Sequence, residues 1–140
     1  MKKSVAVLTV ILLTAACKKA EVSTMDTLAE KTGFLTAGVW HFTGFTDRSS
    51  IISTDIITYS ALPACRQDDL RSFNNDGTGE VNEGPTKCNS SDPQSIPVQW
   101  SFVNGETRRI NISGTEYTIN RLDDTSFEFS GGSRNYIYSR

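Results

Sequence analysis

VQWSFVNGETRRINI, residues 98–112, carries the clearest structural signal in this chain. Apolar and polar residues alternate in its first half, and the alternation resumes after Asn104-Gly105. Because neighbouring side chains of a β-strand point to opposite faces, the pattern predicts two strands that share one apolar face. Asn-Gly pairs are typical of tight hairpin turns, since both residues tolerate positive φ. The apolar positions on the shared face are Val98, Trp100, Phe102, Ile110 and Ile112.

Short strands of the same character follow one another from Gly38 to Arg140, separated by turn residues such as Asn, Asp and Gly. This spacing predicts an all-β fold, a small up-and-down antiparallel β-barrel of about eight strands. A β-sandwich is the alternative, but closure into a barrel removes the exposed strand edges. Gly44 allows a bulge, after which Phe45 need not keep the alternation. The segments expected as strands are 39–45, 51–59, 70–73, 78–82, 98–103, 108–112, 117–122, 127–129 and 136–138.

Large apolar residues recur on one face of these strands, and we expect them inside the barrel. Core packing is the first interpretation of this stripe, and the second is that some of its members line a ligand cavity. Eight strands give an interior that side chains can fill or that holds one small ligand. The short strands therefore predict a small cavity. The expected interior residues are Trp40, Phe42, Trp100, Phe102, Ile110, Ile112, Phe127 and Phe129.

Residues 1–16 have the layout of a secretory signal peptide. Two lysines precede the apolar segment Val5–Leu13, which is too short to span a bilayer. The following Leu13-Thr14-Ala15-Ala16-Cys17 resembles a lipoprotein signal, although Thr14 stands where an aliphatic residue is usual. We therefore expect cleavage before Cys17 and acylation of that cysteine. An ordinary signal peptide, leaving Cys17 as a free thiol, is the alternative.

Three segments follow from this layout: the signal peptide at 1–16, a lipidated tether at 17–35 and the barrel domain at 36–140. The tether is polar and mixed in charge, as a flexible spacer is, and a short helix is expected around Asp26–Lys31. Asp26 would cap that helix.

The other two cysteines, Cys65 and Cys88, predict a structural disulfide in an oxidising compartment. A metal pair and a redox pair are the alternatives, but the chain has no C-x-x-C motif and its single histidine is His41. A disulfide here would hold the loop at 83–97 against the segment before the strand expected at 70–73.

Composition and spacing argue against several classes of function. The formal net charge is −2 and no basic cluster is present, so we expect no nucleic-acid partner. Asp68 and Asp69 are adjacent, and on a strand they would point to opposite faces rather than share a proton. No nucleophile–base pattern and no metal-ligand spacing is evident. We therefore expect a protein that is not an enzyme and has no cofactor or metal.

The order of several short motifs resembles the lipocalin-like domain of Gram-negative bacterial lipoproteins. The resemblance covers about residues 35–140, and its motifs are Leu35–Trp40, Cys65–Leu70 with Phe73, Asp76–Thr78, Cys88, Trp100–Phe102, and Tyr117–Ile119 with Leu122 and Phe127. It implies an up-and-down barrel on an acylated tether and brings no catalytic residues.

Together these features predict a membrane-anchored lipoprotein that binds a small apolar or amphipathic ligand without catalysis. Trp40, Trp100 and Tyr117 are the expected ligand contacts. The alternative is a protein-interaction or envelope-structural module with a filled barrel core and a protein partner in the envelope. The expected location is the cell envelope, on the outer membrane facing the periplasm. Surface display is the alternative, and Lys18 and Lys19 after Cys17 do not favour it.

Overall fold

A computed structural model describes residues 27–47, 56–58 and 62–140. Within them one α-helix precedes nine strands, and 3-10 turns occur at Ala64–Arg66 and Val103–Gly105. The helix and strands are α1 Leu28–Thr36, β1 Val39–Asp47, β2 Ile56–Thr58, β3 Leu70–Phe73, β4 Thr78–Asn82, β5 Ser95–Phe102, β6 Arg109–Ile112, β7 Thr115–Leu122, β8 Ser126–Gly131 and β9 Arg134–Ser139. Cys17, Asp26 and most of the strand expected at 51–59 lie outside the described residues.

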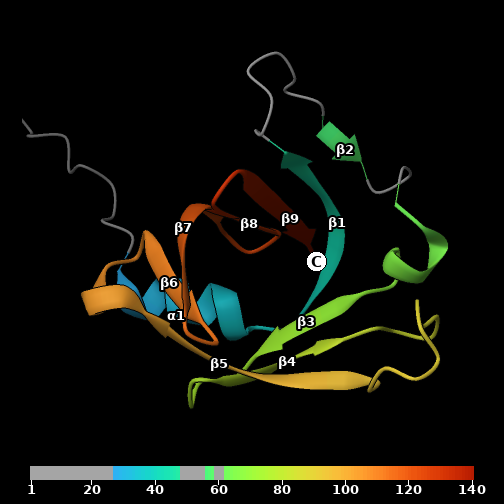
Figure 1. Cartoon of the computed structure of the whole chain (residues 1–140). Coiled ribbons are helices and arrows are strands. Elements are labelled where there is room, and N and C mark those ends of the chain that lie inside the picture. Colours follow the sequence, from blue (N-terminus) through green and yellow to red (C-terminus); the bar gives the residue numbers. More distant parts are fainter. Residues whose placement is uncertain (1–26, 48–55, 59–61) are drawn as a thin grey trace, which may run out of the picture.

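Eight of the strands close into an antiparallel up-and-down barrel, which confirms the expected fold class (Figure 1). Each strand from β3 to β8 pairs with the next along the chain, and β1 closes the barrel by pairing with both β3 and β9. On one edge of β1, only Val39–His41 pair with β3, whereas Gly44–Thr46 pair with the short β2. β1 and β3 are therefore paired only near the start of β1, and they are no longer paired toward its C-terminal end.

Ser113 and Gly114 form a tight turn between β6 and β7, with φ values of 50° and 85°. The tight turn expected at Asn104-Gly105 is replaced by a longer connection from β5 to β6 that begins with the 3-10 turn Val103–Gly105. Asn104 and Gly105 nevertheless have the expected positive φ. Gly77 closes the turn between β3 and β4 with φ at 84°. A left-handed backbone of this kind is cheapest for glycine and asparagine.

A bulge in β1 sets which of its side chains face inward. Phe42 pairs with Tyr138 and Gly44 pairs with Ile137, so Thr43 between them is the extra residue of the bulge. Its hydroxyl donates to the Ile137 carbonyl at 3.0 Å. The alternation is thereby shifted, and Phe45 comes to lie opposite Tyr136. The expected change of phase at Gly44 is confirmed, and Phe42 and Phe45 both contribute to the cavity described below.

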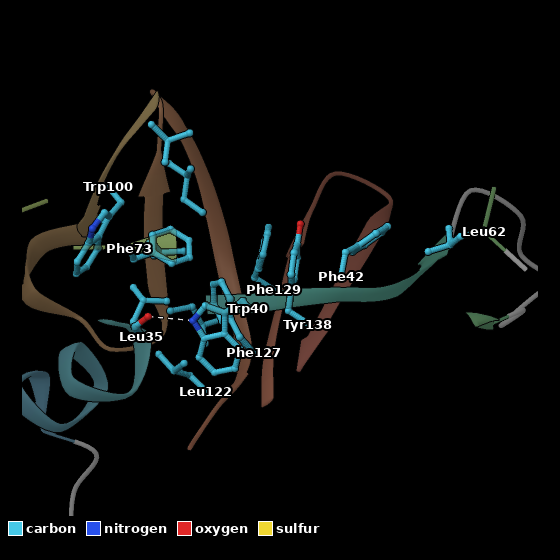
Figure 2. Packing of buried hydrophobic residues seen from close by; sticks show 14 residues of the cluster. Leu35, Trp40, Phe42, Leu62, Phe73, Trp100, Leu122, Phe127, Phe129 and Tyr138 are labelled. Carbon is cyan, nitrogen blue, oxygen red and sulfur yellow. Dashed lines mark hydrogen bonds between the residues drawn. The ribbon is translucent and has the colours of Figure 1, made fainter. Parts of the chain in front are cut away.

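The expected interior stripe forms the core (Figure 2). Seven of its eight residues are buried, and Phe102 is half-buried against the same cluster. Trp40, Phe73, Phe127 and Phe129 are the largest fully buried side chains. Burial of large aromatic side chains supplies most of the stabilisation that a domain this small can gather.

The helix α1 packs against one end of the barrel. Thr27 caps it by accepting a hydrogen bond from the Glu30 backbone amide at 3.1 Å. Leu35 is fully buried, and its carbonyl oxygen accepts a hydrogen bond from the Trp40 indole at 2.9 Å (Figure 2). The boundary that we expected between tether and barrel, at residues 35 and 36, therefore falls inside a helix that belongs to the core.

The disulfide between Cys65 and Cys88 is present, as predicted. It joins the 3-10 turn at Ala64–Arg66 to the loop that leads into β5. Next to it, the Asp68 carboxylate accepts a hydrogen bond from the Thr86 backbone amide at 2.8 Å. The segment before β3 is thus joined to this loop by a covalent bond and by a hydrogen bond.

Candidate functional site

A cavity of about 200 Å³ lies inside the barrel at the end away from α1. Figure 2 shows Phe42 and Tyr138 on this side of the molecule, far from the helix. The cavity is more enclosed than the two larger surface hollows described below. Its walls come from β1, β3, β4, β9 and the Ala64–Arg66 turn: Phe42, Phe45, Arg66, Asp69, Leu70, Arg71, Val81, Arg134, Tyr136 and Tyr138.

Aromatic rings of Phe42, Tyr136 and Tyr138 line one side of this cavity, and the buried Phe129 stacks against the two tyrosines. Phe129 and Tyr138 are nearly parallel, with an interplanar angle of 11° and ring centroids 5.8 Å apart. Tyr136 stacks on Phe129 with centroids 5.2 Å apart, and Phe42 lies 5.2 Å from Tyr138. Burial raises the pKa of the Tyr138 hydroxyl, against the opposing effect of Arg71. The phenol therefore stays neutral and presents a polar tip on an apolar wall.

Arg71 lies over this aromatic wall. Its guanidinium carbon is 5.5 Å from the centroid of Phe129 and 5.3 Å from that of Tyr138. The Nε atom is buried and has no hydrogen-bond partner among the described residues. Arg71 faces inward because it stands two residues before the buried Phe73 on the same strand.

The other charged groups around the cavity are paired. Arg66 lies 3.7 Å from the Asp69 carboxylate, and Arg134 lies 3.4 Å from that of Asp47. Arg134 also covers the ring of Phe45 at 4.6 Å. Burial raises the pKa of Asp69, and nearby Arg66 opposes this rise. The arrangement can hold a small molecule that has both an apolar part and a negative group.

The two tryptophans expected at a ligand are locked into the core. Trp40 is fully buried, with its indole N–H bound to the Leu35 carbonyl. The indole of Trp100 donates to the carbonyl oxygens of Asn74 and Thr78, each at 3.0 Å. Neither tryptophan lines the cavity at the end of the barrel away from α1, which we call the open end.

The third residue expected at a ligand, Tyr117, stands beside the cavity rather than in its wall. Its ring packs edge-on against Phe129 at 5.1 Å and against Tyr136 at 6.4 Å. Tyr117 also leans on Gly131, where an added Cβ would meet the ring at 2.6 Å. A direct ligand contact by Trp40, Trp100 or Tyr117 stays a prediction.

Sequence reasoning missed the residues that do surround the cavity, above all Arg71, Tyr136 and Tyr138. A signal for Arg71 existed. The strand Leu-Arg-Ser-Phe at 70–73 places Arg71 on the same face as the large apolar Phe73, and such a residue favours the buried face. An arginine on the apolar side of a short strand is an anomaly that indicates a function or a buried ion pair.

Two further hollows lie on the outer surface. One of about 560 Å³ lies between α1 and β7 and is lined mainly by polar residues of 118–123 together with Lys31 and Arg108. The Lys31 ammonium donates to the Leu122 carbonyl at 2.6 Å inside it. The other, of about 390 Å³, lies between Leu28 and residues 105–108. Both are shallow and lack an aromatic wall, so neither is as good a binding site as the barrel cavity.

Two observations on the described residues bear on other classes of site. No group of three or more histidine, cysteine, aspartate or glutamate side chains among them is arranged to hold a metal ion. In the same part of the chain, α1 is too short and too polar to cross a bilayer, and no other helix qualifies.

The fold and the cavity define a closed up-and-down β-barrel with an aromatic core and a small hollow at one end.

No model of a known protein family matches the sequence, and no curated protein matches it. Two solved structures are similar in fold. An uncharacterized protein from Bacteroides eggerthii has a TM-score of 0.51 at 9% identity, over 74% of this chain and 97% of that one. A DUF4847 family protein from Bacteroides vulgatus has a TM-score of 0.49 at 14% identity, over 75% of this chain and 93% of that one. At these identities the first likeness shows the fold alone.

Proposed function

We propose that this protein is a non-catalytic binding module that takes one small amphipathic molecule into the open end of its barrel. The observation that carries the proposal is the cavity itself, which combines an aromatic wall with polar groups at fixed positions. Small-molecule sites have this composition: a mainly apolar hollow with a few polar groups that orient the ligand. The resemblance of residues 35–140 to lipocalin-like domains supports the same proposal.

The volume of the cavity limits the ligand to about the size of one ring. Cavities for drug-sized molecules measure about 300–1,000 Å³, whereas an engineered apolar cavity of about 150 Å³ already binds benzene. A volume of about 200 Å³ thus suits a benzene-sized group with one polar substituent. A long acyl chain would need more room, and the buried core residues between the cavity and α1, such as Phe127 and Trp40, would have to move apart.

The module would act in the bacterial cell envelope, held at the membrane by acyl chains on Cys17. The supporting feature is the lipoprotein-like run Leu13–Cys17 after a short apolar segment. One acyl chain alone binds membranes marginally, so stable anchoring needs more than one. The Cys65–Cys88 disulfide is compatible with export to an oxidising compartment.

A second candidate function is a protein-interaction or envelope-structural module. The filled core favours it, because Trp40 and Trp100 leave most of the barrel interior occupied. On this account the surface loops would bind a partner, and the cavity would be a packing defect at the barrel end.

Native mass spectrometry of the full-length protein, gently extracted from its own membranes, separates the two candidates. A small adduct is expected on the wild type. Val81→Phe should abolish it, because Val81 lines the cavity and the added ring would fill part of the space. Val39→Phe is the matched control, since Val39 is 45% exposed and the same change there leaves the cavity alone. An adduct that persists in Val81→Phe would refute binding in this cavity. Bare wild-type protein that cross-links to a partner would favour the interaction module.

The anchoring proposal has a separate test. Cys17→Ala should abolish palmitate labelling and release the protein from the membrane fraction. Labelling that continues in this variant would refute acylation at Cys17.

A further inference from the structure

We propose that the molecule bound in the barrel cavity carries a small oxyanion, a carboxylate in the simplest case, which pairs with Arg71. This inference rests on the proposed function and adds the chemical class of the ligand. Its basis is the position of Arg71 inside the barrel, the state of its hydrogen-bond donors and the pairing of the charges around it.

The backbone directs Arg71 into the interior. Arg71 lies opposite Trp40 on β1 and opposite Val81 on β4, and side chains opposite each other in a sheet lie on the same face. Trp40 is fully buried, and Val81 lines the cavity. The guanidinium is therefore held inside the barrel by the register of three strands, not by a choice of side-chain rotamer at the surface.

Arg71 is half-buried, and a guanidinium whose Nε is buried without a hydrogen-bond acceptor is costly to maintain. Removing a charge from water is strongly unfavourable unless the charge is paired and hydrogen-bonded. The rings of Phe129 and Tyr138 recover part of the cost through cation–π attraction. They do not use the N–H donors, and Nε–H is left without an acceptor among the described residues. Arginine has five such donors in a planar fork, which matches the two oxygens of a carboxylate.

Two carboxylates near the cavity form ion pairs with other arginines. Asp69 lines the same cavity but forms an ion pair with Arg66, and Asp47 pairs with Arg134. Among the described lining residues, three arginines face one aspartate. The lining thus has an excess of positive charge, and Arg71 is its arginine without an ion pair among the described residues. Glu83 lies near Asp69 with a buried, unpaired Oε2, but it does not line the cavity. A bound anion would supply the missing counter-charge and the missing acceptor together.

The same geometry explains why the ligand would be amphipathic. An oxyanion at Arg71 would place the rest of the molecule against Phe42 and Tyr138, whose rings are 5.2 Å apart. Apolar surface is favourably buried there, whereas a free inorganic anion would leave this wall uncovered.

A matched pair of probes tests this inference: benzoate and benzyl alcohol, which share a ring and differ in charge. Binding to the intact mature protein is followed by NMR titration. A hydrogen bond to a charged group contributes a binding free energy that corresponds to about a ten- to hundredfold change in affinity. Benzoate should therefore bind at least about tenfold more tightly than benzyl alcohol. Arg71→Met should remove this preference and leave benzyl alcohol binding within about twofold.

Two more variants make the result specific to Arg71. Arg71→Lys keeps the charge without the planar fork, so this variant should retain a reduced preference for benzoate. It also tests the inference if Arg71→Met does not fold. Arg108→Met removes one exposed arginine outside the cavity and should change nothing.

The outcomes distinguish this inference from the proposed function. Equal binding of the two probes by the wild type, or a benzoate preference that survives Arg71→Met, would overturn the anion site and leave ligand binding in the cavity intact. Failure of both probes to bind would overturn both proposals.

Discussion

Leu35→Ala is the sharpest test of the helix α1 as part of the barrel. Leu35 is fully buried beside Trp40, and buried leucine-to-alanine changes cost about 2.7–5.0 kcal/mol. The hydrogen bond from the Trp40 indole goes to the Leu35 backbone, so the substitution leaves it in place and removes only packing. We expect the free energy of unfolding to fall by about 3 kcal/mol, which for a domain of this size lowers Tm by about 12 °C.

Urea unfolding followed by tryptophan fluorescence measures this change, with Leu28→Ala as the control. Leu28 belongs to the same helix but is 43% exposed, so the same substitution there should cost less than about 1 kcal/mol. If Leu35→Ala costs no more than Leu28→Ala, the helix is a loosely attached tether and its place in the core is refuted.

Three further predictions concern the barrel wall and its turns. Replacing both Cys65 and Cys88 by serine opens a loop whose ends are 23 residues apart and should cost about 3 kcal/mol in urea unfolding; an unchanged midpoint would contradict a structural role. Gly79→Ala would press a Cβ against the Ser72 backbone carbonyl and should destabilise by about 1–3 kcal/mol, whereas a neutral result in the same assay would show that the β3–β4 pairing is looser than described. A guanidinium and turn amides lower the pKa of Asp123, so its stabilisation is present above about pH 4 and is lost as pH falls further. Tm should therefore drop more steeply below that pH in the wild type than in Asp123→Asn, and parallel curves would refute the linkage.

The barrel was predictable because alternation with a period of two is a local property. Trp40, Trp100 and Phe127 each stand in a short alternating run, and each is buried. The hairpin turns followed from Asn and Gly in the same way, since positive φ is a preference of the residue itself.

The helix was underestimated for a related reason. Within α1 only Leu35 is buried, so the segment lacks the apolar stripe that marks a packed helix. Its attachment depends on the fit of that leucine into the barrel end, and such a fit arises only after closure.

The cavity could not be predicted, because residues from four strands and a turn meet there only in the closed barrel. To place Phe45 in the cavity, one must know where the bulge in β1 lies. To place Tyr136 there, one must know the register of β9 against β1. Arg71 breaks the usual rule that charged side chains face water, so a pattern that assigns polar residues to the outside places it wrongly. Violations of local rules concentrate at functional sites.

Intermolecular NOEs show directly whether a small amphipathic anion binds at the end of the barrel away from α1. Benzoate is added to the 13C-labelled mature protein, and contacts from its ring protons are assigned. We predict NOEs to the ring protons of Phe42 and Tyr138, which line the cavity together with Arg71. NOEs confined to the outer hollow between Lys31 and Asp123, or none at saturating benzoate, would show that the cavity does not bind this anion.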